Sequence, residues 1–242
     1  MDIIPVIDLL DGNVVHAQRG QRSLYRPIQS ALSAGSSPRD IVQALLELYP
    51  FTKLYIADLD AIQGQGDNSA IIRQMKSLYP HLDIWLDAGF RHPHEMAFWH
   101  AEGIACVLGS ESLQGLDHYL QLKAKGLEQT ILSLDFTTVG YVGPVELLES
   151  PALWPDKVIT MTLPQVGSNL GPDFGSHHEV LHATRSSGTS ASRIYAAGGV
   201  RGLDDLMQLR AMGIAGVLVA SALHNGTLAA HDIAAVEEKN FQ

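Results

Sequence analysis

AGFRHPHEMAFWHAEGIACVLGSESL (Ala88–Leu113) and GGVRGLDDLMQLRAMGIAGVLVASAL (Gly198–Leu223) are two stretches of this chain that align without a gap, so that Gly89 matches Gly199 and Leu113 matches Leu223. The difference in residue number is the same at every matched position, and we call this constant difference the repeat offset. Nine of the aligned positions are identical, whereas ordinary composition gives about two matches in a stretch of this length. Each stretch is typical of a strand end, a turn, a helix and a further strand. The repeat therefore pairs two strand–helix–strand units at distant places in the chain.

A second pair of stretches extends this repeat. VIDLLDGNVV (Val6–Val15) and LSLDFTTVGYV (Leu132–Val142) each contain an apolar strand that ends in Asp, then a turn with Gly, then Val. The first predicted strand therefore resembles the fifth, as the third and fourth resemble the seventh and eighth. Two fused half-barrels explain both pairs.

Short apolar runs alternate with amphipathic ones along the whole chain. Continuously apolar runs are typical of strands that are covered on both faces. The pattern predicts a (β/α)8 TIM barrel in a single domain over residues 1–242, with an open doubly wound sheet as the competing architecture. The predicted strands are Ile3–Asp8, Lys53–Asp58, Asp83–Asp87, Ala105–Gly109, Thr130–Asp135, Lys157–Thr162, Arg193–Ala197 and Gly216–Ala220. The predicted helices are Pro38–Leu48, Asn68–Leu78, His92–Ala101, Leu116–Lys125, Phe174–Ser186 and Leu203–Met212, with short fifth and eighth helices near PVELLESPALWPD and NGTLAAHDIAAV.

The composition and charge of the chain argue against several classes of protein. The 242 residues carry a formal net charge of −10, which disfavours nucleic acid as the main partner because phosphate backbones repel such a surface. Cys106 is the only cysteine, so no intrachain disulfide forms, and the N-terminus has no signal-peptide pattern. No continuous apolar run approaches the length of about 20 residues that a membrane span needs. We expect a cytoplasmic protein without membrane contacts.

Two carboxylates are the candidate catalytic groups. Asp8 ends the first predicted strand and Asp135 the fifth, on opposite sides of the mouth of a barrel, where side chains point into the active-site cavity. Two carboxylates that flank a substrate suit general acid–base catalysis if their environments separate their pKa values. The alternative is a structural Asp that caps a loop, and the matched positions in the two repeats favour catalysis.

Glycines after two strands are candidate phosphate ligands. Gly198 and Gly199 follow the seventh strand and Ser221 the eighth, at the corner where barrels commonly bind phosphate through backbone N–H groups. The alternative is a tight strand–helix turn. The repeat predicts a twin site at Gly89, Gly109 and Ser110, although Asp87 stands next to it and a carboxylate there weakens phosphate binding unless Arg91 pairs with it.

Three further positions belong to the predicted mouth. Arg19 and Gly20 follow a short hairpin strand, and Arg19 could reach an anion or be a solvated loop residue. Thr160 and Thr162 end the sixth strand and are expected to offer hydroxyls to the cavity, with Thr162 as a catalytic candidate. Asp58 ends the second strand, with a structural role as plausible as a functional one.

One motif points to different chemistry. His178-Glu179-Val180-Leu181-His182 has the His-Glu-x-x-His spacing of zinc hydrolases. The apolar residues of this helix must pack on the barrel, which turns the two histidines outward, and no Glu follows before Glu237 as a third ligand. We therefore expect a solvated helix face and no metal site.

Together these stretches resemble the histidine-biosynthesis barrels, namely phosphoribosylformimino-aminoimidazole carboxamide ribotide isomerase (HisA) and the cyclase subunit of imidazole glycerol phosphate synthase (HisF). The resemblance spans about residues 3–226 and is closer to HisA. It implies a substrate phosphorylated at both ends, an Amadori-type rearrangement without a cofactor, Asp8 as general base and Asp135 as a second active-site carboxylate. It rests on IPVIDLLDGNVV, ADLDAIQG, AGFR, SLD, NLGPDF, AAGGVRGLDDL and GVLVASAL.

The chain departs from this pattern at two places, the position of the general acid and one of the two phosphate-binding turns. The isomerases carry an acidic loop after strand six whose Asp donates a proton, and Val166 stands there instead. Asp87-Ala88-Gly89 replaces a triple-Gly turn. These changes favour a HisA-like paralogue that acts on another phosphorylated substrate. The orthodox HisA isomerase and a non-catalytic phosphate-ligand binder are the alternatives.

Overall fold

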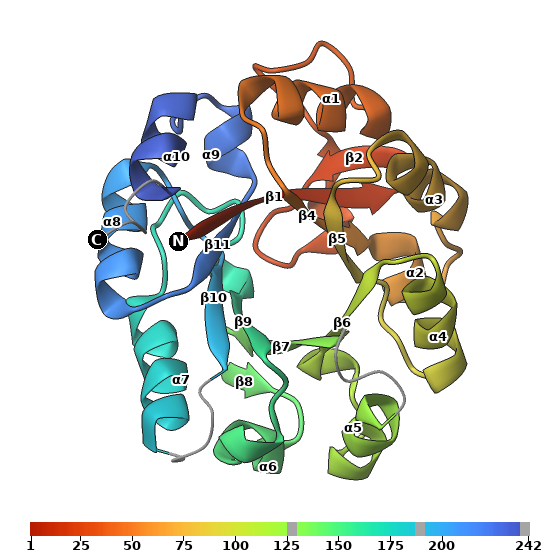
Figure 1. Ribbon diagram of the computed structural model, residues 1–242, viewed down its shortest axis with the longest axis vertical. Coiled ribbons are helices and arrows are strands. Elements are labelled where there is room, and N and C mark those ends of the chain that lie inside the picture. The colour runs from red at the N-terminus through yellow and green to blue at the C-terminus, as the bar shows by residue number, and fades with distance from the viewer. Residues whose placement is uncertain (125–129, 187–191, 238–242) are drawn as a thin grey trace.

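The computed structural model describes residues 1–124, 130–186 and 192–237. Within them, eight parallel strands form a ring that the pairing of the last strand with the first closes. Figure 1 shows these strands around a common centre, with the helices outside them. The open doubly wound sheet is therefore wrong, and the predicted barrel is confirmed. The barrel strands are β1 (Asp2–Leu10), β4 (Lys53–Asp58), β5 (Asp83–Asp87), β6 (Ala105–Gly109), β7 (Thr130–Thr137), β9 (Lys157–Thr162), β10 (Arg193–Ala197) and β11 (Gly216–Val219).

Three short strands extend this sheet at the ends of β1 and β7. β2 (Asn13–His16) folds back on β1 and pairs with β3 (Arg26–Pro27), whereas β8 (Gly140–Val142) folds back on β7. In both hairpins the strand-end aspartate stands opposite a valine of the returning strand, since Asp8 pairs with Val15 and Asp135 with Val142. The two aspartates thus occupy equivalent places on opposite sides of the ring.

The helices cover the outside of the barrel. Helix α1 begins where predicted, with the Ser37 hydroxyl accepting a hydrogen bond from the Asp40 N–H and Pro38 in the first turn. The fifth connection is short because α6 ends before a proline-led 3-10 turn, and residue 125 of the predicted fourth helix lies outside the described residues. The helices are α1 (Pro38–Leu48), α2 (Leu59–Gln63), α3 (Ser69–Leu78), α4 (Pro93–Ala101), α5 (Leu116–Lys123), α6 (Val145–Glu149), α7 (Phe174–Ser186), α8 (Leu203–Met212), α9 (Ser221–His224) and α10 (Ala230–Glu237). None of these described helices is long and apolar enough to cross a membrane.

The barrel interior is filled with side chains. Trp85 on β5 and Tyr195 on β10 occupy matched positions of the repeat and contact each other edge to face, with ring centroids 4.9 Å apart. Both rings are fully buried. The interior is therefore a packed core, as in other barrels of this type.

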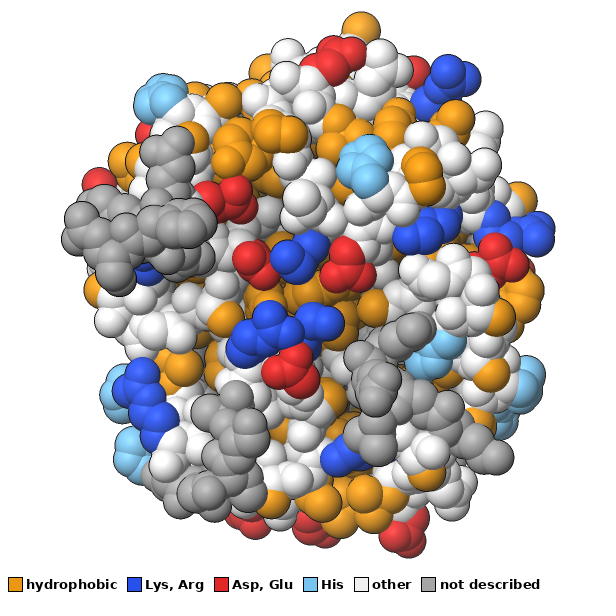
Figure 2. Space-filling model, in the orientation of Figure 1, with side chains coloured by type: hydrophobic (Ala, Val, Ile, Leu, Met, Phe, Trp, Pro, Cys, Tyr) orange, Lys and Arg blue, Asp and Glu red, His pale blue; other side chains and the backbone are white. Residues whose placement is uncertain are grey.

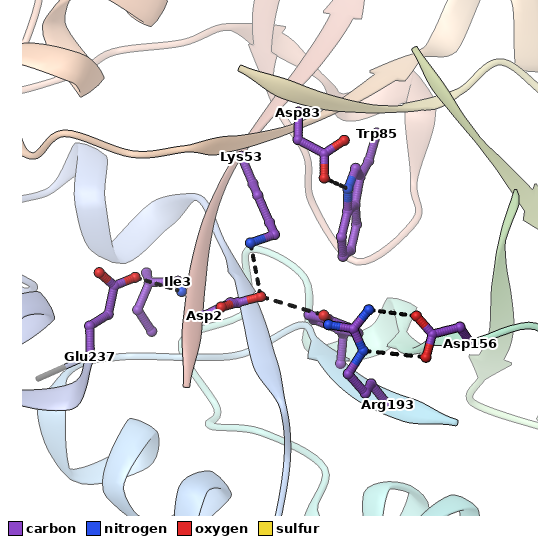
Figure 3. Close-up of polar contacts among 9 residues, drawn as sticks. Asp2, Ile3, Lys53, Asp83, Trp85, Asp156, Arg193 and Glu237 are labelled. Carbon is purple, nitrogen blue, oxygen red and sulfur yellow. Dashed lines mark hydrogen bonds and ion pairs between the residues drawn. The ribbon is translucent and has the colours of Figure 1, made fainter. Parts of the chain in front are cut away.

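Charged side chains close the end of the barrel where the strands begin. Figure 2 shows acidic and basic groups gathered at the centre of this face. The Lys53 Nζ lies 3.1 Å from the Asp2 Oδ2, Arg193 pairs with Asp156, and the Trp85 Nε1 donates to Asp83 (Figure 3). Since these groups form ion pairs and hydrogen bonds with one another, we assign this end of the barrel a structural role. The opposite end, where the strands finish, remains for chemistry.

Candidate active site

A cavity of about 600 Å³ lies at the carboxyl ends of the strands, and both predicted catalytic aspartates line it. Side chains alternate along a strand, so Asp8 shares the inward face of β1 with Ile4 and Val6. The same alternation turns Asp135 inward on β7, after Ile131 and Ser133. The structure therefore brings the two carboxylates of the repeat into one cavity, as the sequence predicts.

Burial brings the titration of both aspartates close to neutral pH. Removal from water raises the pKa of Asp8 to about 7, and the nearby Asp87 carboxylate adds to the rise. Burial also raises the pKa of Asp135 to about 7, although hydrogen bonds from the Ser133 hydroxyl and the Glu111 N–H oppose the rise. Each group can therefore exchange a proton at physiological pH, as general acid–base catalysis needs.

Asp87 is a third carboxylate at this mouth, which the sequence analysis treated only as an obstacle to phosphate. It lines the cavity from the end of β5, accepts a hydrogen bond from the Tyr55 hydroxyl at 3.3 Å and another from the Gly89 N–H at 3.1 Å. Gly109 lies between Asp87 and Asp135. A Cβ at this position would lie 3.2 Å from the Asp135 Oδ2 and 3.7 Å from the Asp87 Oδ2. The absence of a side chain at Gly109 thus makes room for two carboxylates.

The structure does not bring the residues of the predicted twin phosphate site, Gly89, Gly109 and Ser110, onto the cavity. None of the three residues lines the cavity, and Ser110 is fully buried. Its hydroxyl lies 2.6 Å from the Val142 carbonyl and 3.3 Å from the Asp135 Oδ2, and the Glu111 N–H donates to the same Asp135 oxygen at 3.0 Å. The protein's own carboxylate thus occupies the donors that a phosphate would need.

The other predicted phosphate site does open onto the cavity. Gly198, Gly199 and Ser221 all line it, at the ends of β10 and β11. Gly199 has a φ of +85°, and a Cβ there would lie 2.2 Å from the Gly171 carbonyl oxygen, so only glycine fits. The Ser221 hydroxyl lies 3.3 Å from the His16 Nε2. This corner offers the small backbone turn and hydroxyl that phosphate recognition uses.

Two histidines at this corner escaped the sequence analysis. His16 and His224 both line the cavity, from β2 and α9. The Ser30 hydroxyl accepts the Leu32 N–H and lies 2.9 Å from the His224 Nδ1. That buried Nε2 has no hydrogen-bond partner within the described part of the chain. Burial, with His16 nearby, lowers the pKa of His224 to about 4, so its ring is neutral at pH 7.

Arg19 and Gly20 lie at the cavity mouth, as predicted. The backbone N–H of Arg19 donates to the Val166 carbonyl at 2.8 Å, which joins the first loop to the loop after β9. Gly167 permits this contact, since a Cβ there would lie 2.1 Å from the Ala17 carbonyl oxygen. Val166 lines the cavity with an apolar side chain where the family resemblance places an acid.

The predicted role of Thr162 is wrong, and so is the cavity-facing position predicted for Thr160. Met161 lines the cavity, and strand alternation points its two neighbours away from it. The Thr162 hydroxyl donates to the Ala197 carbonyl at 2.8 Å and thus fastens β9 to β10. Asp58 is structural as well, because it accepts hydrogen bonds from the Ala61 and Asn68 N–H groups.

The zinc-like motif is a solvated face of α7, as predicted. His178, Glu179 and His182 are exposed, while Val180 and Leu181 are buried against the barrel. No group of three potential ligands is placed to hold a metal among the residues that the structure describes.

Treatment with EDTA should therefore leave the thermal melting temperature unchanged, because the two exposed histidines of this motif have no third ligand placed beside them among the described residues. Elemental analysis of the purified protein would check this, with a result far below one zinc per chain. A stoichiometry near one, lost in His178→Ala, would contradict the assignment.

Comparison with known proteins agrees with this architecture. Residues 2–229 match the family described as histidine biosynthesis protein. A protein of Methanocaldococcus jannaschii described as uncharacterized is 29% identical over 234 residues, which cover 96% of this chain and 97% of that protein. A phosphoribosyl-substituted imidazole-4-carboxamide isomerase of Listeria innocua is 27% identical over 262 residues, with 100% of both chains covered. An isomerase of the same name from Caldanaerobacter subterraneus is 25% identical over 241 residues, with 94% of each chain covered. With the barrel, its paired aspartates and this match along nearly the whole chain, the protein belongs to the histidine biosynthesis family, that of HisA and HisF.

Proposed function

We propose that this protein is an isomerase of the HisA type, which performs an aldose–ketose rearrangement by acid–base catalysis on a phosphorylated substrate other than the histidine intermediate. The observation that carries the proposal is the pair Asp8 and Asp135, which line one cavity and each have a pKa of about 7. The relatives named as isomerases match this chain along nearly their whole length.

The surroundings of the two carboxylates suggest their roles. No described residue donates a hydrogen bond to the Asp8 carboxyl group, so its lone pairs are free to take a proton from the substrate carbon next to the carbonyl. Both oxygens of Asp135 already accept hydrogen bonds, from Ser133 and from the Ser110–Glu111 turn. Asp135 is therefore the weaker base, and in its protonated form it acts as the acid that Val166 does not supply.

The phosphate of the substrate is held at the corner of Gly198, Gly199 and Ser221. The backbone turn, the Ser221 hydroxyl and the buried His224 Nε2, which has no hydrogen-bond partner among the described residues, support this placement. The histidine intermediate carries two phosphates in the family resemblance, and the second corner is filled by carboxylates here. This difference favours another substrate over the orthodox HisA reaction.

Proton exchange tests the chemistry before the substrate is known. We expect the protein, incubated in D2O with a panel of aldose and ketose phosphates, to exchange the proton next to the carbonyl of at least one of them, as seen by 1H NMR. A gene for this chain should fail to rescue a histidine auxotroph that lacks the isomerase. Rescue would support the orthodox reaction, whereas ligand-induced thermal stabilisation without exchange of any candidate would support a non-catalytic binder.

The pH dependence of turnover follows from the two pKa values. We expect kcat/KM to peak near pH 7 and to fall about tenfold per pH unit on either side. On the acid side Asp8 gains the proton that disables it as a base, and on the alkaline side Asp135 loses the proton that it must donate. A profile that stays flat from pH 5 to pH 9 would contradict these roles.

A further inference from the structure

We propose that the substrate carries a single phosphate and, at its opposite end, an amine in its ammonium form. This inference rests on the proposed function, since it names the substrate class of the same cavity. The phosphate belongs at the corner of β10 and β11. The amine belongs at the mouth of β5 and β6, beside Asp87 and Glu111.

The repeat shows how the two ends of the cavity differ. The two matched strands begin and end at positions related by the repeat offset, since β5 spans Asp83–Asp87 and β10 spans Arg193–Ala197. The backbone contacts obey it too, because the Arg91 N–H donates to the Glu95 carboxylate and the Arg201 N–H to the Asp205 carboxylate. Positions that the repeat offset matches can therefore be compared as structural equivalents.

At this offset, two carboxylates replace residues of the phosphate corner. Ala197 corresponds to Asp87, and Ser221 corresponds to Glu111 rather than to Ser110. All four residues line the cavity. One half of the barrel thus presents small and hydroxyl side chains where the other half presents two negative charges.

This acidic end disfavours a second phosphate. A phosphate dianion next to Asp87 and Glu111 meets like charge in a partly buried place. Two backbone donors that could offset the repulsion are in use, because the Glu111 N–H bonds to Asp135 and the Gly89 N–H bonds to Asp87. Among the described residues that line the cavity, four are acidic and Arg19 is the single Lys or Arg, on a loop joined to the β9 side.

An ammonium group fits this end better than a metal ion or a neutral group. Asp87 and Glu111 line the cavity and have no part in the proposed proton transfer, and each carboxylate oxygen can accept more than one hydrogen bond. The carboxylates here are not arranged as a ligand set for one metal ion within the described ranges. An ammonium has three N–H donors and a positive charge, and charge-assisted hydrogen bonds to carboxylates are the stronger class.

Binding of matched probes tests this inference. Isothermal titration with inorganic phosphate comes first, and saturable binding that Gly199→Ala removes shows that the phosphate corner is present. Alkyl monophosphates of four to seven carbons, ending in an amine, a hydroxyl or a second phosphate, are then compared at pH 7.5. We expect the best amine probe to bind about tenfold more tightly than its hydroxyl match, and the bisphosphate to bind more weakly than both.

Variants assign the preference to the acidic end. Asp87→Asn should reduce the advantage of the amine over the hydroxyl probe at least about threefold, since one carboxylate is lost. Asp83→Asn, at the opposite end of the same strand, is the matched control and should leave the advantage intact. A bisphosphate that binds as tightly as the amine, with or without Mg²⁺, or an amine advantage unchanged in Asp87→Asn, would overturn the inference. Failure of inorganic phosphate to bind would instead overturn the phosphate corner and with it the proposed function.

Discussion

Asp8→Asn is expected to lower kcat/KM by about 10³-fold, the largest functional effect of any single substitution in this protein. The asparagine keeps the shape of the side chain but has no basic oxygen to take the substrate proton, and general acid–base groups contribute about 10²–10⁴-fold. KM should change little, since the phosphate corner is untouched. Steady-state kinetics, or the rate of proton exchange in D2O, measures the loss.

The same substitution should make the protein more stable at alkaline pH. The unfolded chain loses the Asp8 proton near its ordinary pKa of 3.8, whereas the folded protein keeps it up to about pH 7. The folded state therefore loses stability as the pH rises from about 4 to about 7, because a carboxylate must then be buried with its charge. At pH 8, Asp8→Asn should raise the free energy of unfolding by about 2 kcal/mol, after allowance for water at the cavity mouth. Below pH 4 the difference should vanish.

Asp11→Asn supplies the control for Asp8→Asn. Asp11 is exposed at the turn of the same hairpin, and its side chain does not line the cavity. It should leave both turnover and stability close to those of the unaltered protein. Retention of turnover in Asp8→Asn, or destabilisation of that variant at pH 8, would show that Asp8 is not the buried base.

Gly199→Ala is expected to abolish phosphate binding and to cost several kcal/mol of stability. The added methyl group would lie 2.2 Å from the Gly171 carbonyl oxygen, which is backbone and must move together with the loop after β9. The positive φ adds strain for any residue with a side chain. Thermal shifts with and without inorganic phosphate measure both losses.

Gly64→Ala separates the clash from the backbone strain. Gly64 ends α2 with a φ of +68°, close to that of Gly199, but a Cβ there meets nothing within 4 Å. Its substitution should cost about 1 kcal/mol and leave phosphate binding intact. If Gly199→Ala behaves like Gly64→Ala, the corner is looser than the structure indicates and the phosphate assignment fails.

Much of the fold follows from short-range patterns. Short apolar runs mark the barrel strands, and the repeat marks which of them correspond. Strand ends such as Asp87 and Thr162 were placed correctly because polar or turn residues follow the buried runs directly. β1 and β7 end later than predicted, because each pairs with a returning strand, β2 or β8, that extends it. This extension depends on pairing between strands and not on the sequence of either strand alone.

The site was predicted in part, and the failures have physical causes. Asp8 and Asp135 were found because a strand end fixes where a side chain lies along the barrel axis. The side chain of Thr162 was predicted to face the cavity, but it faces the opposite side of the strand. Neighbouring side chains on a strand point to opposite sides, so an error of one residue exchanges the cavity for the helix layer. The burial of Ser110 behind Asp135 depends on a hydrogen bond between two different strand ends, and no local pattern announces such a contact.

The two histidines were missed for a related reason. His16 and His224 lie near opposite ends of the sequence and enter one corner only because β11 closes onto β1. One signal was available for the acidic end, since the repeat offset already matches Glu111 with Ser221 and Asp87 with Ala197. A strict alignment of the two halves would have located it.

Titration of the aspartate carboxyl carbons by 13C NMR tests the central claim most directly, because it needs no substrate. Two resonances should titrate near pH 7, one absent from Asp8→Asn and the other from Asp135→Asn. Both should move to lower pH in Asp87→Asn, since the Asp87 carboxylate raises the pKa of each. Two resonances that titrate near pH 4, unmoved by Asp87→Asn, would contradict a shared buried site for the two catalytic carboxylates.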